Sequence, residues 1–91
     1  MFTGIIEKIG KVNSLEMKDI SLRFTLEING LNSKLGDSIC VNGVCLTIED
    51  LHNNIYSFSV SPETYNLTNL KFLNKGDEVN IETSLTINKL I

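Results

Sequence analysis

The sequence has no tryptophan, and its other aromatic residues are two tyrosines and four phenylalanines in a chain of 91 residues. Basic residues are also scarce, since eight Lys and Arg stand against eleven Asp and Glu, for a net charge of −3, and no two basic residues are adjacent. Proteins that bind single-stranded nucleic acid present stacked aromatic rings along a basic groove. These two shortages argue against a nucleic-acid partner.

Long apolar runs are also missing, so we expect no membrane-spanning segment. The opening stretch MFTGIIEKIG has no basic region, and Glu7 interrupts its apolar residues, so we do not expect a signal peptide. The two cysteines, Cys40 and Cys45, are then expected as free thiols in the cytoplasm. With the single His52 they are too few for a four-ligand metal site, so we expect no metal.

What the sequence does contain is alternation of apolar and polar residues, the pattern of strands that bury one face. The predicted strands lie in residues 4–15, with a bend at Gly10, 22–28, 38–48, 55–60 and 79–85. Because residues 38–48 contain two strands, the count is about six, at the short and even spacing typical of a small barrel or sandwich. The turn-rich stretch His52-Asn53-Asn54 precedes the strand at 55–60. The chain, residues 1–91, is long enough for one domain with one modest core.

The stretch SICVNGVCLTI, residues 38–48, predicts a β-hairpin. Asn-Gly between β-branched residues favours a type I′ turn, because both central residues of that turn need positive φ. A two-residue turn at Asn42-Gly43 pairs Val41 with Val44, Cys40 with Cys45 and Ser38 with Thr47. A disulfide between the two cysteines is sterically possible, but a reducing compartment disfavours it.

The two faces of this hairpin differ in chemistry. The apolar face is expected in the core and consists of Ile39, Val41, Val44, Leu46 and Ile48. The opposite face consists of Ser38, Cys40, Cys45 and Thr47. That face could be ordinary surface. However, cysteine is seldom left on open surface, so the alternative is that a flat and partly polar molecule covers it.

One segment, SPETYNLTNL, departs from the strand pattern and predicts a short helix. Ser61 is a favourable N-cap, Pro62 suits the first helical position, and Glu63 complements the helix dipole. The residues that follow are poor helix formers, so one or two turns are expected. Glu63 and Thr64 are either simple helix-start residues or polar groups for a ligand.

Four segments, MFTGIIE, VNGVCLTI, SPETYNLTNL and KGDEVNIE, occur in an order and at distances that resemble the first of the two lumazine-binding repeats of riboflavin synthase. The resemblance covers essentially the whole chain. It implies an all-β fold, a six-stranded antiparallel Greek-key barrel with a short helical segment. It also implies an enzyme that transfers a four-carbon unit between two molecules of 6,7-dimethyl-8-ribityllumazine, giving riboflavin and a pyrimidinedione without a metal or redox cofactor.

The resemblance also implies a set of substrate-binding positions. They are Gly4, Ile5, Ile6, Cys45, Leu46, Thr47, Ser59, Val60, Ser61, Pro62, Glu63 and Thr64. To these we add Ser38, which lies opposite Thr47, and Phe2 as a cover of the pocket. Backbone groups of Leu46 and Val60 are expected to bind the amide-like edge of the ring, and Glu63 and Thr64 to hold the ribityl hydroxyls. No residue is an obvious base for the methyl proton that the reaction must remove.

The chain departs from the family at its end, because the family continues beyond Leu90-Ile91 into a second barrel and a trimerising helix. It is therefore either an excised N-terminal domain or a natural single-barrel relative. We weigh two functions: an enzyme half with little or no activity alone, and a non-catalytic lumazine- or flavin-binding module. The full enzyme is expected to be a homotrimer, and two copies of this single barrel could pair as a homodimer.

Overall fold

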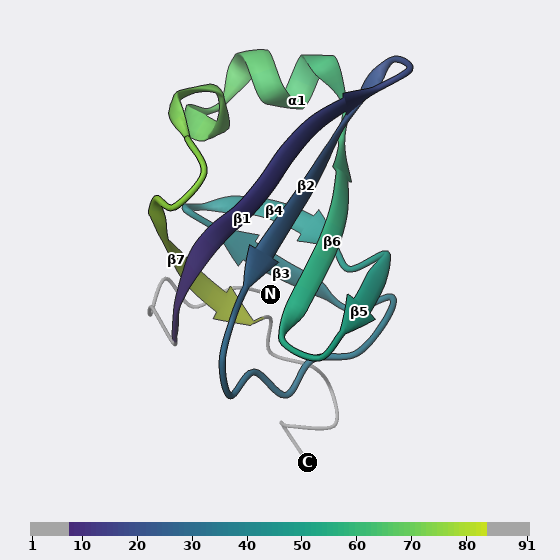
Figure 1. Cartoon of the computed structure of the whole chain (residues 1–91). Helices are drawn as coiled ribbons and strands as arrows, with labels where there is room; N and C mark the ends of the chain where they lie inside the picture. Colours follow the sequence, from purple (N-terminus) through teal and green to yellow (C-terminus); the bar gives the residue numbers. More distant parts are fainter. Residues whose placement is uncertain (1–7, 84–91) are drawn as a thin grey trace.

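The computed structural model describes residues 8–83, which form one antiparallel sheet of seven strands with two short helical segments. The elements are β1 (Lys8–Lys18), β2 (Ser21–Glu27), β3 (Ser38–Val41), β4 (Val44–Thr47), β5 (Asp50–His52), β6 (Ile55–Val60), α1 (Pro62–Leu67), the 3-10 helix η1 (Asn69–Phe72) and β7 (Glu78–Thr83). Their order across the sheet is β4-β3-β7-β1-β2-β6-β5 (Figure 1). The expectation of an antiparallel all-β fold with a short helix is confirmed.

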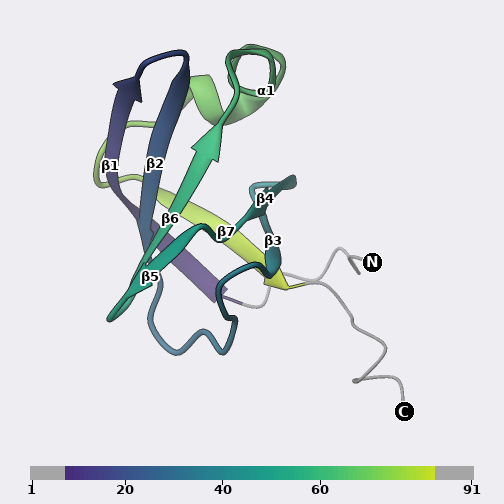
Figure 2. The ribbon, with the colours of Figure 1, turned by 90° about the vertical axis from the view of Figure 1, so that its right-hand side faces the viewer.

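The sheet is curled rather than flat. It curls far enough that Cα atoms of β4, at one end of the strand order, come within 8 Å of β6, near the other end. Figure 2 shows β4 beside β6 and below α1. A register shift between Val12 and Ser14 in β1 contributes to the curl, because a bulge bends its strand and increases the local twist.

The bend expected at Gly10 therefore lies further along β1, and Gly10 has a different role. A Cβ atom at this position would lie 3.0 Å from Cγ1 of Ile28 and 3.3 Å from Cγ1 of Ile81. The backbone of β1 thus packs closely against two core side chains, and glycine leaves the space that this needs.

Residues 8–83 alone contain one strand more than the six expected for the chain. Asp50–His52 forms β5 and pairs with β6 across a tight turn in which Asn53 has φ of 56°. His52 is therefore the last residue of a strand, opposite Ile55, and not part of the turn. Three residues are too few to show alternation, which is why the sequence pattern did not reveal this strand.

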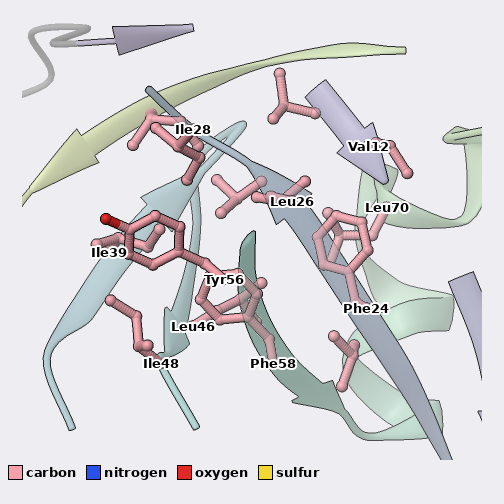
Figure 3. Packing of buried hydrophobic residues seen from close by; sticks show 14 of the residues in the cluster. Val12, Phe24, Leu26, Ile28, Ile39, Leu46, Ile48, Tyr56, Phe58 and Leu70 are labelled. Atoms are coloured by element: carbon pink, nitrogen blue, oxygen red, sulfur yellow. The ribbon is translucent and has the colours of Figure 1, made fainter. Parts of the chain in front are cut away.

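The core lies inside the curl (Figure 3). Its buried side chains are Val12, Leu22, Phe24, Leu26, Ile28, Ile39, Val41, Leu46, Ile48, Tyr56, Phe58, Val60, Leu70, Val79 and Ile81. The rings of Phe24 and Phe58 have centroids 6.2 Å apart, and the hydroxyl of Tyr56 donates to the Leu31 carbonyl at 3.2 Å. Within residues 8–83, no helix is long and apolar enough to cross a membrane.

Candidate functional site

The β3–β4 hairpin has the predicted register. Val41 pairs with Val44, Cys40 with Cys45 and Ser38 with Thr47. Asn42 and Gly43 both have positive φ, 48° and 87°, as a type I′ turn requires. Ile39, Val41, Leu46 and Ile48 are buried, whereas Val44 beside the turn is only half-buried.

The outer face of the hairpin is also as predicted. Ser38 and Cys40 are half-buried, and Cys45 and Thr47 are exposed. The hydroxyl oxygens of Ser38 and Thr47 lie 3.5 Å apart across the ladder. Small polar side chains therefore meet on this face, with the aliphatic side chains of the same two strands in the core.

Among the described residues, the backbone of β4 is bonded by a strand on one side only. The Ile48 N–H donates to the Asp37 carbonyl and the Gly36 N–H to the Ile48 carbonyl, both at 2.9 Å, so the backbone of Ile48 faces the β3 side. Because successive residues of a strand point their backbone groups to opposite sides, Leu46 also faces β3. Cys45 and Thr47 then point their N–H and C=O groups away from β3, toward an edge with which no strand of residues 8–83 pairs.

The same alternation holds in β6. The Ile28 N–H donates to the Asn54 carbonyl at 2.9 Å, so the backbone of Asn54 faces β2. Every second residue along β6 points its backbone groups to the same side, so the backbones of Phe58 and Val60 also face β2. The Ser57 carbonyl points the other way and accepts from the Glu49 N–H at 2.8 Å.

Ser59 lies two residues after Ser57 in β6, so its backbone groups point to the same side of the strand. Pairing of β5 with β6 stops at Asp50 and Ser57. The backbone groups of Ser59 therefore extend beyond the end of β5, on the side opposite β2.

Two strand edges that are close in space but not bonded to each other are thus left between β4 and β6. We call this region the edge site and define it by Cys45, Thr47 and Ser59, with the first turn of α1, residues 61–64, beside it (Figure 2). The backbones of Leu46 and Val60, which we expected to bind the ring, instead pair with β3 and β2. Among residues 8–83, the backbone groups that no neighbouring strand bonds here are those of Cys45, Thr47 and Ser59.

The first turn of α1 adds polar groups that are partly engaged in the helix itself. Ser61 is the N-cap, and its hydroxyl oxygen accepts from the Thr64 N–H at 3.2 Å and contacts the Thr64 hydroxyl at 3.1 Å. Pro62 is at the start of the helix, as expected. The Glu63 side chain is exposed and has no hydrogen bond or ion pair within the part of the chain that the structure describes.

One polar group of this region was not anticipated from the sequence. The Ser59 hydroxyl donates to Oε1 of Glu49 at 2.7 Å, so a carboxylate lies against the edge site. Glu49 follows Thr47 by two residues and therefore continues the outer face of β4. The alternation of side chains along a strand could have predicted this position from the sequence. Arg23, which pairs with Ser59 in the β2–β6 ladder, forms a long contact of 3.9 Å with the Asp50 carboxylate.

The expected site residues are thus only partly brought together by the described structure. Cys45, Thr47, Ser59 and residues 61–64 surround the edge site, and Ser38 lies across the ladder from Thr47. The side chains of Leu46 and Val60 are in the core. Phe2, Gly4, Ile5 and Ile6 lie outside the described residues.

The thiol of Cys40 has a raised pKa. Burial is the main cause, the Glu82 carboxylate and Cys45 raise the pKa further, and a hydrogen bond from the Gly43 backbone lowers it. Cys40 is therefore a protonated thiol at neutral pH. Within residues 8–83, no three His, Cys, Asp or Glu side chains lie close enough to hold a metal ion.

A shallow hollow lies next to Cys40, between the β3–β4 turn and β7. Its polar groups already bond one another, since the Asn80 N–H donates to Oδ1 of Asn42 at 2.7 Å and the Asn69 amide to the Asn42 carbonyl at 3.4 Å. These bonds hold the turn against β7 and η1. The hollow adjoins the edge site through the Cys40–Cys45 pair but is not lined by Cys45, Thr47 or Ser59, and we assign it a structural role.

Comparisons with known proteins agree on one family. The family model described as "Lumazine binding domain" matches residues 3–84. Riboflavin synthases from Bacillus amyloliquefaciens and Bacillus subtilis (strain 168) are 39% and 40% identical to the chain over 90 residues, which is 97% of this chain and 42% of each relative. The chain thus spans less than half the length of these relatives, and it matches their N-terminal half.

Two solved structures have the same fold. LumP complexed with 6,7-dimethyl-8-(1'-D-ribityl) lumazine has a TM-score of 0.84 at 24% identity, and the match covers 92% of this chain and 49% of LumP. LumP complexed with riboflavin also has a TM-score of 0.84, at 22% identity, with 96% and 50% covered. At these identities the likeness supports the fold alone.

Proposed function

The chain belongs to the lumazine-binding domain family, and we propose that it binds 6,7-dimethyl-8-ribityllumazine and riboflavin at the edge site, as the N-terminal half of a riboflavin synthase. The observation that carries this proposal is the pair of strand edges that no strand of residues 8–83 bonds, from Cys45 and Thr47 on one side and Ser59 on the other. Backbone groups without partners are uncommon inside folded domains, and a ligand with matching groups would satisfy them.

The heterocycle fits these edges in chemistry and shape. One rim of the lumazine ring carries carbonyl and N–H groups in alternation, the same sequence of acceptors and donors that a strand edge presents. The backbone groups of Cys45, Thr47 and Ser59 could bond this rim. Because the side chains of Ser38, Cys45 and Thr47 are small, they leave room for a flat ring, and they supply few but convergent polar groups, as is typical of ligand sites.

The ribityl chain, with its hydroxyl groups, would extend toward the first turn of α1. Glu63 has no partner among the described residues and is free to accept hydrogen bonds. Thr64 is half-buried beside it. Glu49, already bonded to Ser59, is a second carboxylate within the same region. In this proposal Ser61 and Pro62 contribute by fixing the start of the helix.

The synthase reaction joins two lumazines, and one chain supplies one edge site. In our proposal the chain holds one substrate, and a second barrel holds the other against it, so that much of the rate enhancement comes from positioning. The single domain then has little or no transferase activity alone. The proposal also includes a cytoplasmic protein that is trimeric when the second barrel is present, or a homodimer of the single barrel about a twofold axis.

A non-catalytic binding module is the alternative. In favour of it, the described residues of the edge site include no histidine, and no residue there is an evident base for removing a methyl proton. The two candidate functions share the same ligand and the same site. They differ only in what happens when a second barrel is supplied.

Fluorescence titration with 6,7-dimethyl-8-ribityllumazine tests ligand binding. We expect a saturable change with one ligand per chain. Cys45→Leu should abolish the change, because the larger side chain would occupy the edge site, whereas Glu16→Leu, at an exposed position in the part of β1 that pairs with β2, should leave it intact. No change at high micromolar protein would contradict the proposal. Riboflavin formation after joining the chain to a second barrel would favour the synthase, and binding without product would favour the module.

A further inference from the structure

Cys40 and Cys45 lie opposite each other on the outer face of the β3–β4 hairpin. In a two-residue hairpin the pair next to the turn, Val41 and Val44, shares backbone hydrogen bonds. The next pair along does not, and side chains of such pairs lie closer together. Ser38 and Thr47 form the other pair of this kind in the ladder, and their hydroxyl oxygens are 3.5 Å apart. Side chains on this face therefore meet across the two strands.

This kind of pair suits a disulfide. Directly opposed residues that share no backbone hydrogen bonds have Cα atoms about 4.5 Å apart, which lies within the range of roughly 4.4–6.8 Å that a disulfide spans. Both cysteines are free thiols in the structure. The hairpin already holds them in register through the turn and the backbone ladder, so joining the two sulfur atoms requires little movement of the backbone.

The two thiols differ in accessibility. Cys45 is exposed and Cys40 is half-buried. Burial and the nearby Glu82 carboxylate raise the pKa of Cys40, which disfavours its thiolate. An incoming reagent should therefore meet Cys45 first.

We propose that Cys40 and Cys45 form a modification site that is oxidised by low-molecular-weight disulfides such as oxidised glutathione. In the first step the Cys45 thiolate attacks one sulfur of the reagent, the reagent's S–S bond breaks, and the released thiolate takes up the proton that Cys45 lost. In the second step the Cys40 thiolate attacks the Cys45 sulfur of this mixed disulfide and releases the second reagent thiol. The protein loses two hydrogen atoms and gains an S–S bond, and the reagent is reduced to two thiols.

This site would be coupled to ligand binding, and that part of the inference rests on the proposed function. Cys45 belongs to the edge site, so a ring bound there would cover its thiol. Coupling between two binding events is reciprocal. Oxidation of the pair should therefore weaken riboflavin binding, and bound riboflavin should slow oxidation.

Intact-mass measurement after incubation with oxidised glutathione tests the thiol pair. The wild-type chain should lose both thiols and the mass of two hydrogen atoms, with no glutathione retained. Cys40→Ser should retain one glutathione, because nothing resolves the mixed disulfide, and Cys45→Ser should react slowly. A wild-type chain that retains glutathione, or that forms covalent dimers, would overturn the proposal.

Ser38→Cys combined with Thr47→Cys, in a chain that also carries Cys40→Ser and Cys45→Ser, is the matched control. It places the thiols at the other pair of the same kind, and it should close in the same way. Closure in this control but not in the wild type would show that Cys40 cannot reach Cys45.

Repeating the reaction with riboflavin separates this proposal from the proposed function. At riboflavin ten times its dissociation constant, thiol loss should slow about tenfold, because only the unbound chain reacts. If the pair closes but riboflavin neither binds nor protects, the thiol pair stands and the ligand site is misplaced. If riboflavin binds and the pair does not close, the reverse holds.

Discussion

β2 and β4 are strands of one sheet, but they use their edges differently. β2 is bonded along both sides, to β1 and β6, over nearly its whole length. Within residues 8–83, β4 is bonded to β3 alone, and its other side faces β6 without pairing. Both strands bury one face in the core, but only β4 leaves backbone groups without a strand partner among residues 8–83, and it is there that we propose a ligand binds.

The strongest test of the role of β2 is removal of a core ring. Phe24 is buried between strands and packs against Phe58 with centroids 6.2 Å apart. Phe24→Ala should lower the free energy of unfolding by about 3–5 kcal/mol, through lost burial and the cavity that remains. Urea denaturation followed by circular dichroism measures this.

Arg23→Ala is the matched control on the outer face of β2, next to Phe24. It removes the 3.9 Å contact with Asp50 and a half-buried side chain, so the loss should stay below about 1 kcal/mol. If the two variants were equally destabilised, the separation of faces in β2 would be wrong.

β4 should show both behaviours in adjacent residues, and Leu46 reports on its core face. Leu46 is 6% exposed, and Leu46→Ala should lower the free energy of unfolding by about 2–5 kcal/mol. The lower half of that range is expected because a strand bonded on one side can relax more easily into the cavity. Thermal or urea unfolding of the free chain measures the loss. Full stability after this substitution would mean that the hairpin register is reversed, since a slip of one residue exchanges the two faces.

Thr47 reports on the open face of the same strand. Thr47→Val keeps the shape of the side chain and removes its hydroxyl, which is exposed and only 3.5 Å from that of Ser38. Stability should change little. Riboflavin binding should weaken about two- to tenfold, the value of one ordinary hydrogen bond, in a fluorescence titration. Unfolding of this variant would contradict the exposed placement of the side chain, and unchanged affinity would remove the Thr47 hydroxyl from the ligand contacts.

These faces could be predicted from the sequence because they depend on local rules. Asn42-Gly43 specifies the turn, and the period of two in a strand then assigns each side chain to a face. The identity of the free backbone groups could not be predicted in this way. It depends on the β2–β6 register and on the point at which β5 stops pairing with β6. Both are set by contacts between distant segments, and the three-residue strand β5 has no pattern of its own.

The smallest expected effect is a difference in how the outer face of the hairpin and the core contribute to stability at alkaline pH. Burial raises the pKa of Cys40 in the hairpin and of Tyr56 in β6. In each case the folded chain holds the proton more tightly than the unfolded chain. The contribution to stability is complete below the ordinary values, 9.0 for cysteine and 10.0 for tyrosine, and is lost as the pH rises through the raised pKa.

Unfolding free energies measured in steps from pH 8 to pH 11 should therefore begin to fall above about pH 9 and fall further above about pH 10. Cys40→Ser should remove the earlier part of the decline and Tyr56→Phe the later part. The Cys40 step should be the weaker of the two, because this half-buried thiol is partly screened by water. The Tyr56 hydroxyl instead donates to the Leu31 carbonyl at 3.2 Å from a ring that is 3% exposed. A larger step from Cys40 than from Tyr56 would mean that the Cys40 thiol is more deeply buried than its half-buried position indicates. It would weaken the contrast between the open outer face of the hairpin and the closed core of the sheet.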